Sequence, residues 1–252
     1  MTIDPTLLQI EARAGATDLD LSHFDFERLS PGDDLVFSNC RFDAARLSGE
    51  ALAASTWINC TFSGAAFASA DLRDARFQAC RFYNATEVQG SSFQFCTLTR
   101  AAFVGCDVSL SAFNGCEAHE ITFTECQMRG AQFDRTVFAY SPGRKRAIHA
   151  TFDRCGLRDA LFDGADLTAC RFTDCDMTGI ALRDARLINA ALRNCTVMAP
   201  QMVGADLSGA DLRGSTLNGV NLAELRACAG MKVSAGQQHF LLNSLGITVD
   251  PN

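Results

Sequence analysis

The sequence predicts an all-β protein whose chain winds into a square coil, a quadrilateral parallel β-helix. A large apolar residue recurs at every fifth position over most of the 252 residues, and a small residue stands two positions before most of them. Eleven of the twelve cysteines occupy this small position. A period of five fits neither a helix, which repeats every 3.6 residues, nor a strand, which repeats every 2. A coil with four five-residue sides, and therefore twenty residues per turn, explains the pattern.

The period runs from Phe37 to Leu222, with a one-residue slip through Val88 and a longer break after Phe138. We expect the large and small residues to fill the lumen and the other three of each five to face water. The cysteines at small inward positions are Cys40, Cys60, Cys80, Cys96, Cys106, Cys116, Cys126, Cys155, Cys170, Cys175 and Cys195. They lack the close pairs of metal sites, so we interpret them as small core residues. Cys228 lies outside the pattern.

Composition excludes several classes of protein. With 48% hydrophobic and 20% charged residues, the chain can bury a large core and is not disordered. It has no apolar run long enough to cross a bilayer, and it begins with acids rather than a basic signal sequence, so we expect a cytoplasmic protein. The net charge of −7 argues against direct nucleic-acid binding. No histidine stands in a triad-like spacing and no phosphate-binding glycine motif is present, so we expect no enzyme, cofactor or metal.

The chain divides into three parts. Residues 1–35 form an acidic N-terminal extension or cap, with a helix expected over 4–15 that starts at Pro5 and ends at Gly15. Residues 36–227 form the β-helix, which is interrupted by loops at about 83–92 and 139–150. Residues 228–252 form a C-terminal helix followed by a strand.

The two interruptions are the expected contact points for a partner, because an insertion extends from a rod without disturbing its stacking. The alternative is that each is a solvated excursion. The second contains a Ser-Pro-Gly turn and a basic cluster. The side chains expected to bind a partner are Tyr83, Asn84, Glu87, Gln89, Tyr140, Arg144, Lys145, Arg146 and His149.

The C-terminal segment contains a capping box, Ser234 to Gln237, followed by an apolar stripe that Gly246 ends. A solenoid needs a cap at its open end, and this helix could serve only that purpose. An apolar helix at the end of a rod also suits the pairing of two chains. The expected homodimer contacts are Phe240, Leu241, Leu245 and Ile247.

The motifs "ADLRD", "ADLTA", "ADLSG", "ADLRG" and "VNLAE" resemble the signature of pentapeptide-repeat proteins. That resemblance implies a right-handed coil. The segments "CRFY" at 80–83, "GAQF" at 130–133 and "LGITV" at 245–249 are further similar to the quinolone-resistance (Qnr) pentapeptide proteins. The resemblance implies a dimeric rod that binds DNA gyrase or topoisomerase IV. Such a rod would act in place of duplex DNA and protect the enzyme from quinolone-type poisons, with the two loops helping.

The charge pattern leaves a second function open. If the slip at Val88 keeps the four sides in register, acids fall on all of them and no acidic stripe is expected. In that register one side collects the arginines Arg41, Arg81, Arg154, Arg171, Arg193 and Arg213. The alternative function is a non-enzymatic scaffold or adaptor with an unrelated protein partner. Deletion of 139–150 would separate the two, because topoisomerase protection depends on that loop.

Overall fold

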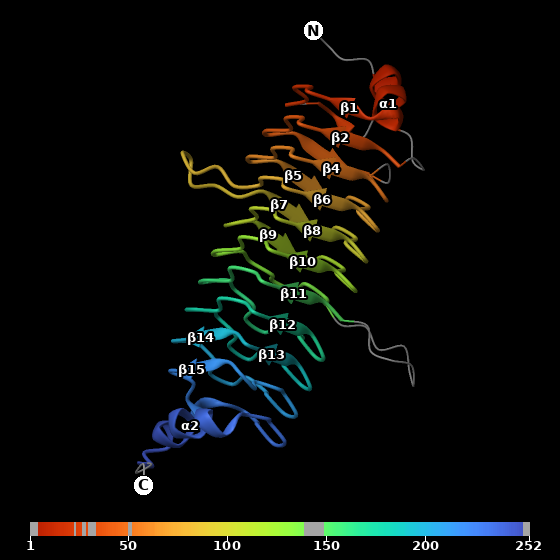
Figure 1. Cartoon of the computed structure of the whole chain (residues 1–252). Coiled ribbons are helices and arrows are strands. Elements are labelled where there is room, and N and C mark those ends of the chain that lie inside the picture. The colour runs from red at the N-terminus through yellow and green to blue at the C-terminus, as the bar shows by residue number, and fades with distance from the viewer. Residues whose placement is uncertain are drawn as a thin grey trace, which may run out of the picture.

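The computed structural model describes residues 5–22, 24–26, 29, 34–49, 52–138 and 149–248. The chain forms an elongated parallel β-solenoid of about nine turns (Figure 1). Helix α1, Pro5–Ala14, lies at one end and helix α2, Gln238–Ser244, lies at the other. The fold expected from the five-residue period is confirmed.

Four sides succeed one another along the chain, and we number them 1 to 4 from Phe37. Side 1 is a nine-stranded parallel sheet, ordered β1-β2-β4-β6-β8-β10-β11-β12-β13. Its strands are Ala16–Thr17, Val36–Ser38, Thr56–Ile58, Arg76–Gln78, Ala102–Val104, Thr122–Thr124, Thr151–Asp153, Arg171–Thr173 and Ala191–Arg193.

The other three sides are paired more sparsely. Side 2 consists of a ladder of single bridges that starts at Asp20 and Arg41. It ends in β14, Thr196–Met198, and β15, Thr216–Asn218. Side 3 holds β3, Arg46–Ser48, β5, Ala66–Ala68, β7, Ser92–Gln94, and β9, Ala112–Asn114. Side 4 is the ladder Asp71, Thr97, Glu117, Val137, Asp166, Arg186 and Asp206.

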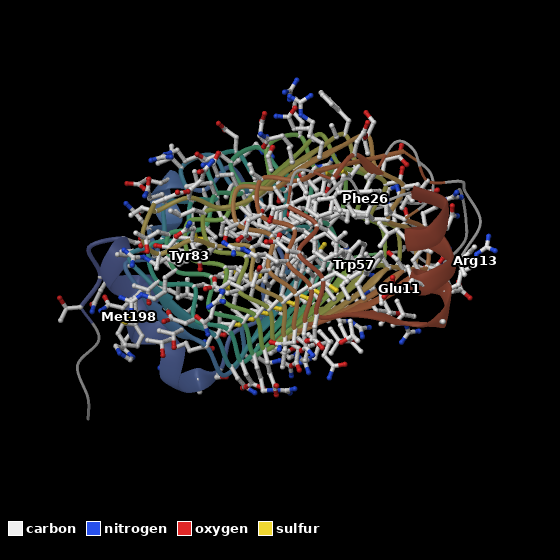
Figure 2. The ribbon with its side chains drawn as sticks, turned by 90° about the horizontal axis from the view of Figure 1, so that it is seen from above. Glu11, Arg13, Phe26, Trp57, Tyr83 and Met198 are labelled. Atoms are coloured by element: carbon white, nitrogen blue, oxygen red, sulfur yellow. The ribbon has the colours of Figure 1, made fainter. Side chains whose placement is uncertain are left out.

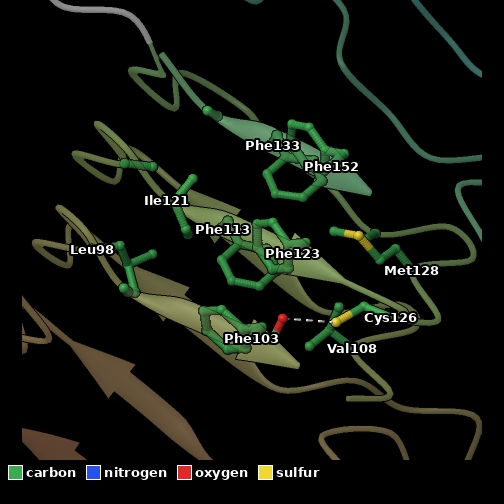
Figure 3. Packing of buried hydrophobic residues seen from close by; sticks show 14 of the residues in the cluster. Leu98, Phe103, Val108, Phe113, Ile121, Phe123, Cys126, Met128, Phe133 and Phe152 are labelled. Carbon is green, nitrogen blue, oxygen red and sulfur yellow. Dashed lines mark hydrogen bonds between the residues drawn. The ribbon is translucent and has the colours of Figure 1, made fainter. Parts of the chain in front are cut away.

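The lumen is filled by columns of stacked rings. On side 1, Phe77 stacks on Phe103 with ring centroids 4.7 Å apart. Phe103 in turn stacks on Phe123 at 4.9 Å (Figure 3). Rings of neighbouring sides meet edge to face, as Phe103 and Phe113 do at 87°. Such pairs add about 0.5–1.5 kcal/mol each beyond the burial of their area. The narrow lumen and this stacking explain why the chain uses phenylalanine so often.

Eight of the cysteines form a column at the edge where side 1 meets side 2, and Figure 2 shows their sulfur atoms in a line. Each thiol donates to carbonyl oxygens of the coil: Cys126 Sγ lies 3.4 Å from the oxygen of Phe103 (Figure 3). All twelve cysteines are free thiols. Burial raises the pKa of Cys170 to about 12, so this thiol stays protonated at neutral pH.

The solenoid begins earlier than its sequence period. Strand β1 pairs with β2, and Asp20 and Asp25 bridge to the next coil, so much of the expected extension over 1–35 is a first coil. Its large inward residues include Leu21 and Phe26, both buried. Helix α1 covers the open end above this coil, with Leu8 and Ala12 buried.

The first interruption lies at the corner between sides 2 and 3 and does not add a side. Phe67 pairs directly with Phe93, so 26 residues separate equivalent positions there instead of twenty. Val88 is 63% exposed and belongs to the loop. The expectation that Val88 points inward is therefore wrong, and every later residue lies one side away from its expected place.

The C-terminal end is closed by a buried amide. The last strand is followed by two 3-10 helices, Leu222–Glu224 and Ala235–Gln237. The side chain of Gln237 donates to the carbonyls of Leu212 and Ser215 and accepts from the backbone N–H of Ser234. The expected cap is thus present. The described residues after Gly246, which are 247 and 248, form no strand. Neither helix of the described chain has the length and apolar content that a membrane crossing requires.

Candidate partner-binding surfaces

The first loop is a small β-hairpin at the corner between sides 2 and 3. Asn84 and Gln89 pair antiparallel, with N···O distances of 2.8 and 3.2 Å. The Asn84 side chain also accepts from the N–H of Thr86 and Glu87, at 3.0 and 3.3 Å. Asparagine readily makes such a turn with its own side chain. The hairpin is therefore shaped by its own sequence.

Two residues fix the hairpin to the coil. A Cβ on Gly90 would lie 2.3–2.5 Å from backbone atoms of Leu110 and Ser111, so the chain approaches the next coil more closely there than any side chain allows. Ser91 is 2% exposed and donates to the carbonyls of Phe62 and Phe82. The base of the hairpin is held firmly while its tip is free to meet a partner.

The expected contact residues of this loop share one surface. Glu87 and Gln89 are exposed, and Tyr83 and Asn84 are half-buried at the base. Gln89 lies over Gly64 of the preceding coil. Val88, at the tip, was not expected among the contacts. Its exposure makes it the most apolar group that the hairpin offers.

The second loop leaves the coil after Phe138 and returns at His149, at the corner between sides 4 and 1. This corner is diagonally opposite to that of the hairpin. Tyr140, Arg144, Lys145 and Arg146 lie outside the described residues. His149 is half-buried where the chain rejoins the coil.

Side 4 is the most acidic of the four sides. In the described residues between 71 and 209, six carboxylates face outward on it beside three arginines: Asp71, Asp74, Glu117, Glu120, Asp166 and Asp206 against Arg73, Arg100 and Arg186. Arg100 binds Asp74 at 2.7 Å, whereas Glu117 and Glu120 make no ion pair with another described residue. Acids fall on all four sides in this register too, as at Asp174 on side 1, Asp176 on side 2 and Asp184 on side 3, so no uniform acidic stripe runs along the rod.

The arginines do not share one side either. Arg154, Arg171, Arg193 and Arg213 lie on side 1, whereas Arg41 and Arg81 lie on side 2. The expectation of a single arginine side is therefore wrong. Side 1 is basic only in its C-terminal half.

The C-terminal end presents two exposed apolar side chains. Leu245 and Ile247 are each 48% exposed, and Phe240 is half-buried beside them. Leu241 is 6% exposed and packs inside its own chain, so it is not available to a partner. Of the four expected dimer contacts, three lie at the surface.

The described residues contain no group of three or more metal-ligating side chains. Their titratable groups form ion pairs between neighbouring coils, such as Arg183 with Asp163 at 2.8 Å. These are the surface contacts of a rod, and each contributes little on its own.

Comparison with known proteins gives two family matches. A model of the pentapeptide repeat region matches residues 147–224, and a model of eight copies of the pentapeptide repeat matches residues 51–84. No curated protein sequence matches the chain.

Solved structures match over most of the chain. Full-length QnrB1, described as a plasmid-mediated fluoroquinolone resistance protein, gives a TM-score of 0.66 at 24% identity, covering 92% of this chain and 98% of that one. HetL, a pentapeptide repeat protein involved in heterocyst differentiation regulation from the cyanobacterium Nostoc sp., gives 0.59 at 14% identity, covering 86% and 84%. At these identities the likeness establishes the fold.

Proposed function

Since this chain is a pentapeptide-repeat protein that resembles the Qnr proteins in fold, we propose that it binds DNA gyrase or topoisomerase IV and protects it from quinolone-type poisons. In this proposal the protein is a homodimer and not an enzyme. It occupies the surface of the topoisomerase that duplex DNA would otherwise fill.

The placement of the two interruptions carries the proposal. The hairpin and the second loop leave the rod at opposite corners, two coils apart, so one rod can touch the two walls of a groove at once. A topoisomerase holds duplex DNA in such a groove. The order of the loops along the chain is the one that the sequence resemblance to the Qnr proteins implies.

The negative charge on side 4 also supports the proposal that the rod occupies a DNA-binding surface. Its carboxylates recur on every second coil, at Asp71, Glu117, Asp166 and Asp206. Coils are about 4.8 Å apart as in any parallel sheet, so these groups are about 10 Å apart along the rod. Duplex DNA presents phosphates at a density of about one charge per 1.7 Å of axis, so side 4 imitates a DNA backbone only thinly. Affinity for the enzyme must therefore come from the loops as well as from charge.

Supercoiling by purified DNA gyrase tests the proposal. The enzyme is assayed with ciprofloxacin while this protein is added. We expect supercoiling to recover at protein concentrations that do not inhibit the drug-free enzyme. No recovery with either gyrase or topoisomerase IV would overturn the proposal and favour a scaffold with another partner.

A deletion variant isolates the hairpin. Removal of residues 84–89 joins Tyr83 to Gly90 and restores five-residue spacing between Phe82 and Phe93, so the coil should continue without strain. We expect this variant to fold and to need at least ten times more protein for the same recovery. Equal protection by the variant would show that the hairpin makes no contact.

A further inference from the structure

A hollow of about 590 Å³ lies at the edge between sides 4 and 1, in the last coils of the rod. Its floor is low because the coil positions there hold small residues, namely Ala169, Ala191 and Gly209. A Cβ on Gly209 would lie 2.2 Å from Asn189 Oδ1 of the preceding coil, so a larger residue there would displace that side chain and fill part of the hollow.

Cationic side chains surround this floor. Arg171, Ala191, Asp211 and Lys232 follow one another on a single ladder of side 1, and Arg193 projects from the same strand as Ala191. Three rungs of about 4.8 Å separate Arg171 from Lys232, a span of about 14 Å. Neither of these two side chains forms an ion pair with another described residue.

The hollow contains one carboxylate, which is already neutralised. Arg213 donates to both oxygens of Asp211 at 2.9 Å, and Arg193 Nε donates to Oδ2 at 2.9 Å. The Arg213 and Arg193 guanidinium groups hold the pKa of this carboxyl well below its usual range. Asp211 thus does not cancel the charge of Arg171 and Lys232. It also shows that arginines on this side bind a carboxylate with good geometry.

We propose that this basic hollow, formed by Arg171, Arg193 and Lys232, binds a short acidic segment of a protein partner. A span of about 14 Å accommodates four or five extended residues at about 3.3 Å each, with carboxylates that reach both ends. A duplex would extend past the hollow onto side 4, where Asp166 and Asp206 repel phosphates. The inference does not depend on which protein the partner is.

Fluorescence anisotropy with a labelled peptide of six glutamates tests the proposal on the full chain at low ionic strength. We expect saturable binding that weakens as salt rises, and no binding of a peptide of six glutamines. Arg171 and Lys232 are the two cations of the hollow that form no ion pair with another described residue. Reversing both charges, by Arg171→Glu with Lys232→Glu, should weaken binding of the glutamate peptide at least tenfold.

The matched control is Arg76→Glu with Arg81→Glu, since both arginines are exposed and lie in coils far from the hollow. This control changes the net charge equally and should weaken binding no more than twofold. Thermal unfolding checks both proteins, and glutamine at positions 171 and 232 replaces glutamate if the reversal does not fold. The proposal is overturned if the glutamate peptide does not bind, or if the two double variants weaken its binding equally. It is also overturned if a duplex oligonucleotide binds as tightly as the peptide.

Discussion

Apart from the corner that carries the hairpin, the described corners between Phe37 and Leu217 each have one residue in a left-handed backbone conformation. Two positions after the large residue, φ is positive, as at Asn39, Asn59 and Asp74 with values of 53°, 52° and 60°. Asparagine, aspartate and glycine adopt this conformation at least cost. Side chains at these corners also join the coils, because Asn59 donates to Asn39 at 2.8 Å. The corner position thus favours these three residue types, but it also holds larger residues such as Phe95 and Leu110.

Of the described glycines, Gly90 is the one at which an added Cβ would lie nearest to backbone atoms, and this contact yields a stability prediction. In Gly90→Ala the new Cβ would overlap backbone of Leu110 and Ser111, so the base of the hairpin must shift. We expect a loss of about 1–3 kcal/mol in the free energy of unfolding, as for other overpacked sites. Denaturant unfolding followed by circular dichroism measures it.

The control is Gly236→Ala, where a Cβ would meet no atom within 4 Å. We expect that substitution to change stability by less than about 0.5 kcal/mol, as is usual at open surface positions. Equal effects of the two alanines would mean that the close contact at Gly90 does not exist.

No single element of the rod is stable alone. Apart from the two-residue β1, the strands are three residues long, and each relies on the coils above and below it. The two ends therefore need caps, which α1 and the buried Gln237 provide. At the C-terminal end, the capping Gln237 directly precedes α2, and the exposed apolar pair Leu245 and Ile247 follows it.

The exposed apolar pair predicts the surface through which two chains associate. We expect the unchanged protein to sediment as a dimer and Leu245→Glu to raise the dimer dissociation constant at least tenfold, because a carboxylate would be buried without a partner. Leu161→Glu is the matched control, since Leu161 is 42% exposed on side 3, away from this end. A dimer that survives Leu245→Glu, or a chain that is monomeric throughout, contradicts this interface.

Periodicity predicted the coil, its inward residues and both interruptions because each side obeys the same local rule. It did not predict the first coil, where the larger residues at Leu21 and Phe26 are flanked by irregular sequence. It also could not tell whether Val88 began a new side or lay in an insertion, since both readings place an apolar residue near the expected position. The pairing of Phe67 with Phe93 decided this.

At the scale of the whole molecule, charge is distributed by side and by end. Side 4 is the most acidic side, with its carboxylates on every second coil, and side 1 is basic towards the C-terminus. This distribution could not be seen in the sequence, because counting Val88 as an inward residue shifts every later residue by one side. The shift mixes residues of sides 4 and 1 with those of their neighbours. The basic hollow was equally hidden, since Arg171 and Lys232 are 61 residues apart and meet only through stacking.

In the proposed function, this rod takes the place of duplex DNA on a type II topoisomerase. A competition experiment tests this directly: DNA gyrase is saturated with a fluorescent duplex and titrated with this protein, and the anisotropy of the duplex is followed. We expect the duplex to be displaced in full, with one dimer replacing one duplex. A duplex that stays bound while this protein also binds, or that stays bound because this protein does not bind at all, would contradict it.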